Sequence, residues 1–168
     1  KEQDPIALLN TYGSIANVYL AREEYERSLG FSIKATEWAA KSQSSYHQVL
    51  VNLSLVTNYV KLNRAATADS LLTITQPIVT AVNIPLLNTL YKIGEAEVAI
   101  TLNQFDKAKE VLTECRVLSR EYVLPTSESE ALLLLSDVSC QQKKYEDAIN
   151  YSLNAATIAE RHHIIEDI

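Results

Sequence analysis

The residues that could do chemistry in this sequence are few, and the histidines are the first to consider. His162 and His163 stand just before Glu166 and Asp167, a set that could supply nitrogen and oxygen ligands to a metal ion. Neighbouring side chains on a helix point about 100° apart, so the two imidazoles cannot converge on one ion without a further ligand. The third histidine, His47, lies far away in the sequence. We therefore expect a solvated helix end here and no metal site.

The two cysteines and the scattered acids are the remaining candidates for catalysis. Cys115 and Cys140 have neither the spacing of metal ligands nor that of a disulfide framework. The sequence has no glycine-rich phosphate loop and no Ser-His-Asp arrangement on a strained turn. Its acids, such as Glu23 and Glu24, fall at predicted turns or helix starts. We expect an inert buried thiol at Cys115, an apolar contact at Cys140, no catalytic residue and no cofactor, so the chain is not expected to be an enzyme.

Charge and hydropathy narrow the class of protein further. A net charge of −6 argues against nucleic acid, which requires a basic surface. The longest apolar run, Ala131 to Leu135, is far too short to span a membrane. The glycosylation sequons at Asn52 and Asn150 fall inside predicted helices, and no secretory signal is visible, so we expect an intracellular protein of the cytoplasm or nucleus. The absence of methionine, even at position 1, predicts a fragment of a longer protein.

A 40-residue repeat organises the chain. Aromatic or small residues recur at Tyr25, Ala65, Phe105 and Tyr145, and small residues follow three positions later at Ser28, Ala68, Ala108 and Ala148. Proline lacks an N–H and fits the first turn of a helix; it occurs at Pro5, Pro85 and Pro125, and Ser45 takes the remaining slot. Small residues at one phase let two helices approach closely, so each repeat is predicted to be a helical hairpin.

Within each half repeat, apolar residues recur at three- and four-residue steps, which is the period of a helix and not of a strand. We predict an all-α solenoid of four antiparallel hairpins, turning near residues 22–24, 62–64, 102–104 and 142–144. The repeats cover about 5–44, 45–84, 85–124 and 125–163, and they form a single domain over residues 1–168. Each hairpin leaves part of its core uncovered until a neighbour stacks on it.

The repeats resemble the tetratricopeptide repeat (TPR). Repeat one does so through Tyr12, Ile15, Ala16 and Tyr19, then Ser28, Ser32 and Ala35, and repeat two through Leu55, Tyr59, Ala68 and Leu72. The family repeat is about 34 residues long, so each helix here should be longer by roughly one turn. Glu95 stands where the family has an apolar residue, which puts the packing of repeat three in doubt. The resemblance implies a TPR-like α-solenoid with a right-handed superhelix and a non-catalytic role in protein–protein interaction.

A shorter stretch carries a finer resemblance. Ala68 to Leu72, followed by Gln76 to Ile78, is similar to the C-terminal TPR region of anaphase-promoting complex subunit five. That likeness implies a scaffold subunit of a large ubiquitin ligase in the cell cycle. Long repeats of this kind also occur in bacterial peptide-sensing regulators and in kinesin light chains. A peptide-sensing TPR regulator and a cargo adaptor are therefore the alternatives.

The resemblance also implies where a partner would bind. In the family, the first helix of each hairpin lines a concave groove where a partner binds. The residues at the corresponding helix positions here are Asn17, Leu20, Leu53, Thr57, Val60, Ile93, Glu97, Ile100, Leu133 and Asp137. Glu97 and Asp137 would repel a terminal carboxylate, and Asn17 is the only amide among these positions, whereas a peptide sensor predicts several. An apolar floor with acidic spots suits a partner helix or extended segment with Leu-like anchors and a few basic residues. The alternative is that neighbouring repeats of the same chain fill the groove.

The last predicted helix carries more apolar residues than a solvated cap should. These are Ile149, Leu153, Ile158, Ile164 and Ile165. A repeat array without a polar cap exposes an unfinished apolar face. We therefore expect the C-terminal hairpin to dock on another segment or chain.

Overall fold

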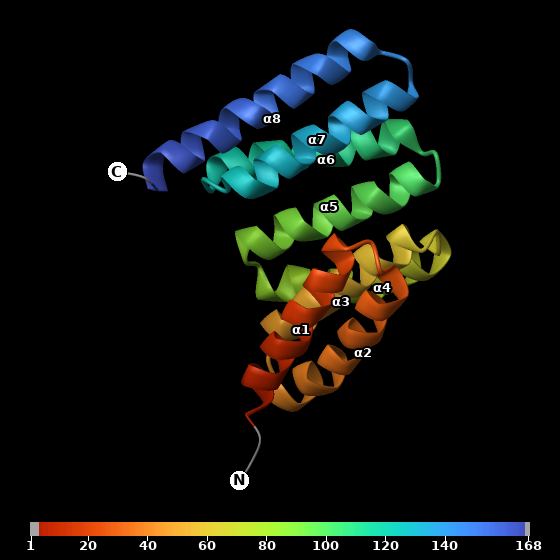
Figure 1. Cartoon of the computed structure of the whole chain (residues 1–168), viewed down its shortest axis with the longest axis vertical. Coiled ribbons are helices and arrows are strands. Elements are labelled where there is room, and N and C mark those ends of the chain that lie inside the picture. The colour runs from red at the N-terminus through yellow and green to blue at the C-terminus, as the bar shows by residue number, and fades with distance from the viewer. Residues whose placement is uncertain (1–3, 167–168) are drawn as a thin grey trace. The chain divides into compact units, whose positions relative to one another are not determined.

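A computed structural model describes residues 4–166, with side chains through residue 162, and these residues form helices without strands (Figure 1). The helices are α1 (Pro5–Ala21), α2 (Tyr25–Ser42), α3 (Ser45–Lys61), α4 (Ala65–Val82), α5 (Pro85–Thr101), α6 (Phe105–Glu121), α7 (Pro125–Gln141) and α8 (Tyr145–Glu166). The predicted all-α hairpins and the positions of their turns are confirmed. None of the described helices is both long and apolar enough to cross a bilayer.

The helix starts follow from local chemistry. A proline occupies the first turn of α1, α5 and α7, where its missing N–H removes no hydrogen bond. The side chain of Asp4 caps α1 by accepting from the backbone N–H of Ile6 at 2.9 Å. Ser44 caps α3 in the same way, with its Oγ 3.4 Å from the backbone nitrogen of His47. These signals mark the first helix of each hairpin at a spacing of 40 residues, and with the second helices included every helix begins 20 residues after the one before it.

The helix ends share a second local feature. In the turn after each of the first seven helices, one residue has a positive φ, between 48° and 61°. These residues are Glu23, Gln43, Asn63, Asn83, Asn103, Val123 and Lys143. This left-handed conformation usually belongs to glycine at a helix C-terminus, and asparagine is the next best tolerated residue. Three of the seven positions are asparagine and none is glycine. Val123 is the outlier, because its branched Cβ makes the left-handed region unfavourable.

Replacing Val123 by asparagine is therefore expected to raise the free energy of unfolding by about 1 kcal/mol, since left-handed strain costs about 1–2 kcal/mol. Val123 is 81% exposed, so the change removes almost no packing. The matched control is Asn103→Val, which places the same side chain at the equivalent turn, where φ is 58°, and should lower stability by a similar amount. Urea unfolding followed by circular dichroism measures both. Equal stability of Val123→Asn and the unchanged protein would contradict the strain.

The chain divides into two compact units, the first ending at Asn83 and the second beginning at Ile84. Each contains two of the predicted repeats, and within each unit consecutive helices pack against one another. In the first unit, Leu9, Ala35, Ala39 and Val51 form a core cluster with the half-buried Tyr12 and Trp38. In the second unit, the main cluster is Ile93, Ala96, Val111, Leu112, Cys115, Ala131 and Leu135. The predicted right-handed superhelix concerns the whole chain and stays a prediction.

The predicted phase of small residues is confirmed. Ser28, Ala68, Ala108 and Ala148 are all buried where the second helix of a hairpin meets its neighbours. Ser28 brings a hydroxyl into this contact, and its Oγ donates to the carbonyl oxygen of Ala16 at 2.9 Å across the α1–α2 hairpin. The buried polar group is therefore satisfied, as buried hydroxyls usually are.

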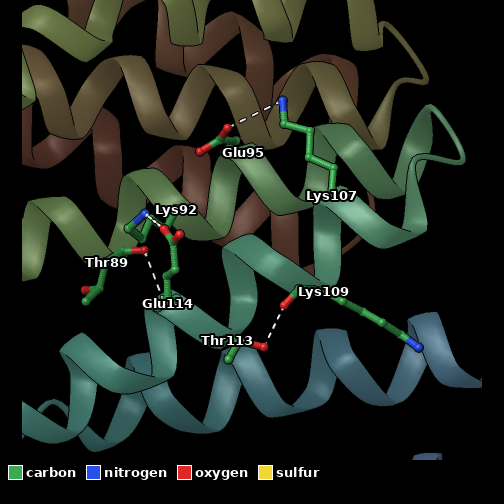
Figure 2. A network of polar contacts seen from close by, with 8 residues as sticks. Thr89, Lys92, Glu95, Lys107, Lys109, Thr113 and Glu114 are labelled. Carbon is green, nitrogen blue, oxygen red and sulfur yellow. Dashed lines mark hydrogen bonds and ion pairs between the residues drawn. The ribbon is translucent and has the colours of Figure 1, made fainter.

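Glu95, the departure from the family pattern, keeps its charge near the surface. Its carboxylate lies 3.4 Å from Lys107 Nζ of α6, and both side chains are partly exposed (Figure 2). A second ion pair, Lys92 Nζ to Glu114 Oε2 at 2.5 Å, also joins α5 to α6. Glu95 therefore does not disturb the packing of repeat three, because its charge lies at the partly exposed edge of the α5–α6 contact and not in its core.

Candidate functional site

The last hairpin, α7–α8, exposes a face whose equivalent on the preceding hairpin, α5–α6, is buried. On α5–α6 the equivalent face is covered by α7, which contacts both helices. Ile93 of α5 is 5% exposed and packs in a cluster with Ala131 and Leu135 of α7. Leu133, which stands 40 residues after Ile93, is 51% exposed. The same repeat position is therefore core in one hairpin and surface in the next.

The second helices of the two hairpins show the same contrast. Leu112 and Ser119 of α6 are fully or almost fully buried, whereas their counterparts on α8, Ser152 and Ala159, are exposed. Cys140 is likewise exposed, although its counterpart Ile100 is half-buried against Ala99, Ala108 and Val138. We name this surface the open face of α7–α8.

Large apolar side chains line one side of the open face. Tyr145, Ile149 and Leu153 follow one another at four-residue steps along α8 and are 61%, 59% and 61% exposed. The counterparts of Ile149 and Leu153 on α6 are the polar Lys109 and Thr113, so polar positions of one repeat have become apolar in the next. Contiguous exposed apolar residues usually mark an interface, whereas single ones do not.

Two hollows run along this hairpin between its helices. One, of about 540 Å³, is lined by Ser136, Cys140, Tyr145, Ala148, Ile149, Ser152, Leu153 and Ala156. The other, of about 330 Å³, is lined by Pro125, Thr126, Ser129, Glu130, Leu133, Ile158, Ala159 and His162. Small residues and large apolar residues both line these hollows. That lining suits apolar side chains projecting from a partner.

The hydroxyl groups on the open face are directed back into the hairpin. Ser136 Oγ donates to the carbonyl oxygen of Ala148 at 2.9 Å, and it lies 2.9 Å from Ser152 Oγ. Ser129 Oγ lies 3.4 Å from the carbonyl oxygen of Ala155. Since these groups are bonded within the hairpin, covering them with an apolar partner leaves none of them unsatisfied.

The residues predicted to line a concave groove fall into different environments. Leu53 and Ile93 are buried, and Ile93 packs against Ala131 and Leu135 of α7, so a partner surface at these two residues stays a prediction. Asn17, Leu133 and Asp137 are exposed, and Leu20, Thr57, Val60, Glu97 and Ile100 are half-buried. The structure places Leu133, Asp137 and Cys140 together on α7. Residues of α1 and α3 belong to the other unit, so a continuous stripe over all four hairpins stays a prediction.

The cysteines and histidines show what chemistry is present. Cys115 is fully buried, and burial raises the pKa of its thiol to about 11, partly offset by the hydroxyl of Ser119. The predicted burial of this thiol is confirmed, and its low reactivity stays a prediction. Among the described residues no cluster of three or more histidine, cysteine or acidic side chains could hold a metal ion. The side chains of His163, Glu166 and Asp167 lie outside the described residues, as do those of Ile164 and Ile165.

Ile149, Leu153 and Ile158 on the last helix were predicted from the sequence, but Tyr145 and the two hollows were not. A comparison of corresponding positions in repeats three and four indicates the apolar row on α8, because Lys109 becomes Ile149 and Thr113 becomes Leu153. The hollows depend on how α7 and α8 approach each other, which no single position encodes.

No family model and no curated protein matches the sequence. Solved structures do match the fold. A Rap protein complexed with Competence and Sporulation Factor is 13% identical with a TM-score of 0.82, over 95% of this chain and 45% of that one. Aspartyl phosphate phosphatase F from Bacillus subtilis is 14% identical with a TM-score of 0.76, over 96% of this chain and 43% of that one.

A third similar structure is a signal transduction ATPase with a tetratricopeptide repeat sensor from Pyrococcus horikoshii. It is 19% identical with a TM-score of 0.73, over 91% of this chain and 23% of that one. The chain thus has a TPR-like helical-repeat fold and spans less than half the length of each of these proteins. None of the three is named as a subunit of the anaphase-promoting complex, so that finer resemblance gains no support from them.

Proposed function

We propose that this chain is a non-catalytic polypeptide-binding module and that the open face of α7–α8 receives an amphipathic helix from a protein partner. The observation that carries the proposal is the repeat comparison: Ile93 is 5% exposed and its counterpart Leu133 is 51% exposed. Burying apolar surface is the main favourable term in protein association. A partner helix would pack on α7–α8 as α7 packs on α5–α6. It would thus make, from another molecule or segment, a contact that the chain already makes internally.

The internal contact also defines what the partner should look like. α7 contributes Ala131, Leu135 and Val138 to the apolar clusters that it shares with α5 and α6. These residues stand at i, i+4 and i+7, so they form one stripe along the helix. A helix with small and medium apolar residues at the same spacing fits the small side chains that line the larger hollow of the open face.

The test places charged residues on the open face and compares this variant with a matched control variant. The variant Leu133→Glu with Ile149→Glu places two charges on the face, and Ile74→Glu with Val117→Glu places the same charges on comparably exposed apolar residues elsewhere. The tagged protein carrying each pair is purified from cells, and bound proteins are identified and quantified. We expect a specific partner to be lost with the first pair and kept with the second, at unchanged helical circular dichroism. A partner retained with the first pair, or no stable partner at all, would refute the proposal.

A sensor is the second candidate, favoured by the likeness to proteins described as a TPR sensor and as a Rap protein bound to a factor. A sensor must change conformation on binding, whereas a scaffold subunit need not. Fluorophores on Ser70→Cys and Glu146→Cys, in a Cys140→Ser background, would report the distance between the two units. A change in energy transfer on adding the purified partner supports the sensor. Constant transfer supports the scaffold, of which a place in the anaphase-promoting complex would be one form.

A further inference from the structure

A stripe of alternating cationic and aromatic side chains runs along α2. It consists of Arg27, Phe31, Lys34, Trp38 and Lys41, and we name it the basic aromatic stripe. The steps alternate between four and three residues, which keeps all five side chains on one narrow strip of the helix. The chain as a whole has a net charge of −6, so this strip is locally opposite in sign to the molecule.

Two tyrosines from α1 hold the first ring of the stripe in place. The ring of Tyr19 stacks on Phe31 with centroids 5.4 Å apart and planes 10° apart. Tyr12 stacks on the same phenylalanine at 6.3 Å and 28°. All three rings are half-buried in the α1–α2 hairpin. This aromatic part of the stripe is therefore held by packing on several sides.

The cations lie over these rings. Lys41 Nζ is 3.9 Å from the centroid of Trp38, and Lys34 Nζ is 4.9 Å from that of Phe31. Arg27 lies 5.7 Å from the ring of Tyr19 and is also paired with Glu24 at 2.6 Å. Within the described part of the chain, neither lysine has a carboxylate within ion-pairing distance. Two ammonium groups are thus held in position and remain available to an anion.

The spacing of the charges indicates the form of the anion. Cations seven residues apart on one helix lie about 10.5 Å apart along its axis. Steps of three and four residues place these side chains along one face that a second helix could follow lengthwise, with charges in place of part of the apolar seam of a coiled coil. A partner helix with a carboxylate at every seventh residue and an apolar residue between them would meet each lysine with a charge and each ring with an apolar contact.

We propose that the basic aromatic stripe of α2 binds an acidic amphipathic helix of a protein partner, independently of the open face on α7–α8. The cation–π contacts favour this, because a lysine already placed over a ring loses less side-chain entropy on meeting a carboxylate than an unrestrained one does. A membrane fits the stripe less well, since its rings are half-buried in the α1–α2 hairpin and offer little apolar surface for insertion into a bilayer. Glu37 stands three residues after Lys34 and four before Lys41, so its carboxylate flanks the stripe beside both lysines, although it is within ion-pairing distance of neither.

The chain carries its own reporter, because Trp38 is its only tryptophan. The probe is a synthetic, end-capped helical peptide of about three heptads, with glutamate and leucine alternating along one strip. A matched peptide has lysine in place of glutamate. Titration of the glutamate peptide should change the emission of Trp38 and saturate, and added salt should weaken the binding because the contact is ionic and near the surface. The lysine peptide should leave the emission unchanged.

Variants then assign the site. Lys34→Glu with Lys41→Glu should weaken binding of the glutamate peptide about tenfold or more and allow the lysine peptide to bind. Lys143→Glu with Lys144→Glu has the same net charge but lies at the start of α8, and it should bind as the unchanged protein does. Lys34→Arg with Lys41→Arg keeps both cations and should also retain binding. Circular dichroism confirms that each variant is folded.

Several results would overturn the proposal. These are no saturable response to the glutamate peptide, equal weakening in both glutamate variants, or equal binding of the two peptides. A response of Trp38 to anionic phospholipid vesicles without any response to the glutamate peptide would replace the partner helix by a lipid surface. None of these results bears on the open face, whose test uses other residues and another readout.

Discussion

Replacing Leu112 by alanine is expected to lower the free energy of unfolding by about 2–5 kcal/mol. Leu112 is fully buried in the cluster that joins α5, α6 and α7, so the truncated side chain leaves a cavity that its neighbours can fill only in part. The loss combines the transfer free energy of the removed methyl groups with the cost of that cavity. Because the whole side chain is buried, this loss should exceed that of any surface substitution in the chain.

The matched control is Leu153→Ala on α8. Leu153 is mostly exposed, and an exposed substitution usually changes stability by no more than about 0.5 kcal/mol. Urea unfolding should be followed by far-ultraviolet circular dichroism, because the only tryptophan lies in the first unit and Leu112 in the second. Equal losses for the two variants would mean that Leu153 is covered in solution, which would contradict an open face in the isolated chain.

The two cysteines are expected to differ in alkylation rate by well over a hundredfold. Burial raises the pKa of the Cys115 thiol from 9.0 to about 11, which at pH 8 lowers the thiolate fraction about a hundredfold. Cys115 is also inaccessible until the helices open, whereas Cys140 lies exposed on the open face. Mass spectrometry of the intact chain after timed exposure to iodoacetamide measures both rates. Comparable rates would show that the α5–α7 core opens freely.

The same pKa difference predicts a loss of stability at high pH. The unfolded chain releases the Cys115 proton near pH 9, but the folded chain holds it until about pH 11. This group therefore contributes its full stability below pH 9 and loses it as pH rises from 9 towards 11. Unfolding midpoints of the unchanged chain and of Cys115→Ala, measured across this range, isolate the effect from that of lysines and tyrosines. Parallel profiles for the two proteins would contradict the shift.

Much of the fold could be predicted from the sequence, because the helix boundaries depend on local interactions. Pro5, Pro85 and Pro125 mark first turns, and Asp4 and Ser44 cap two helices through their own side chains. The ends were harder to foresee in detail. No sequence signal predicts the left-handed conformation of Val123. Its positive φ follows from the turn, because Val123 occupies the position that Asn103 occupies in the preceding turn of the second unit.

The candidate site was less predictable, because the TPR family indicates which helix positions can contact a partner but not which of these side chains are buried. Leu53 and Ile93 stand at such positions but are buried. The basic aromatic stripe was not anticipated at all. Its residues are visible in the sequence at steps of three and four, but the stack of Tyr12, Tyr19 and Phe31 requires two antiparallel helices to meet.

The order of residues along the chain was enough to place the start and end of each helix and the small residue of each repeat, and hence to predict hairpins. Local sterics, capping and side-chain size are properties of a few consecutive residues, so they need no knowledge of distant contacts. Ile93 and Leu133 show where such knowledge becomes necessary. Both are branched aliphatic residues at one repeat position, yet one is core and the other surface, because α7 covers the first and none of the described helices covers the second.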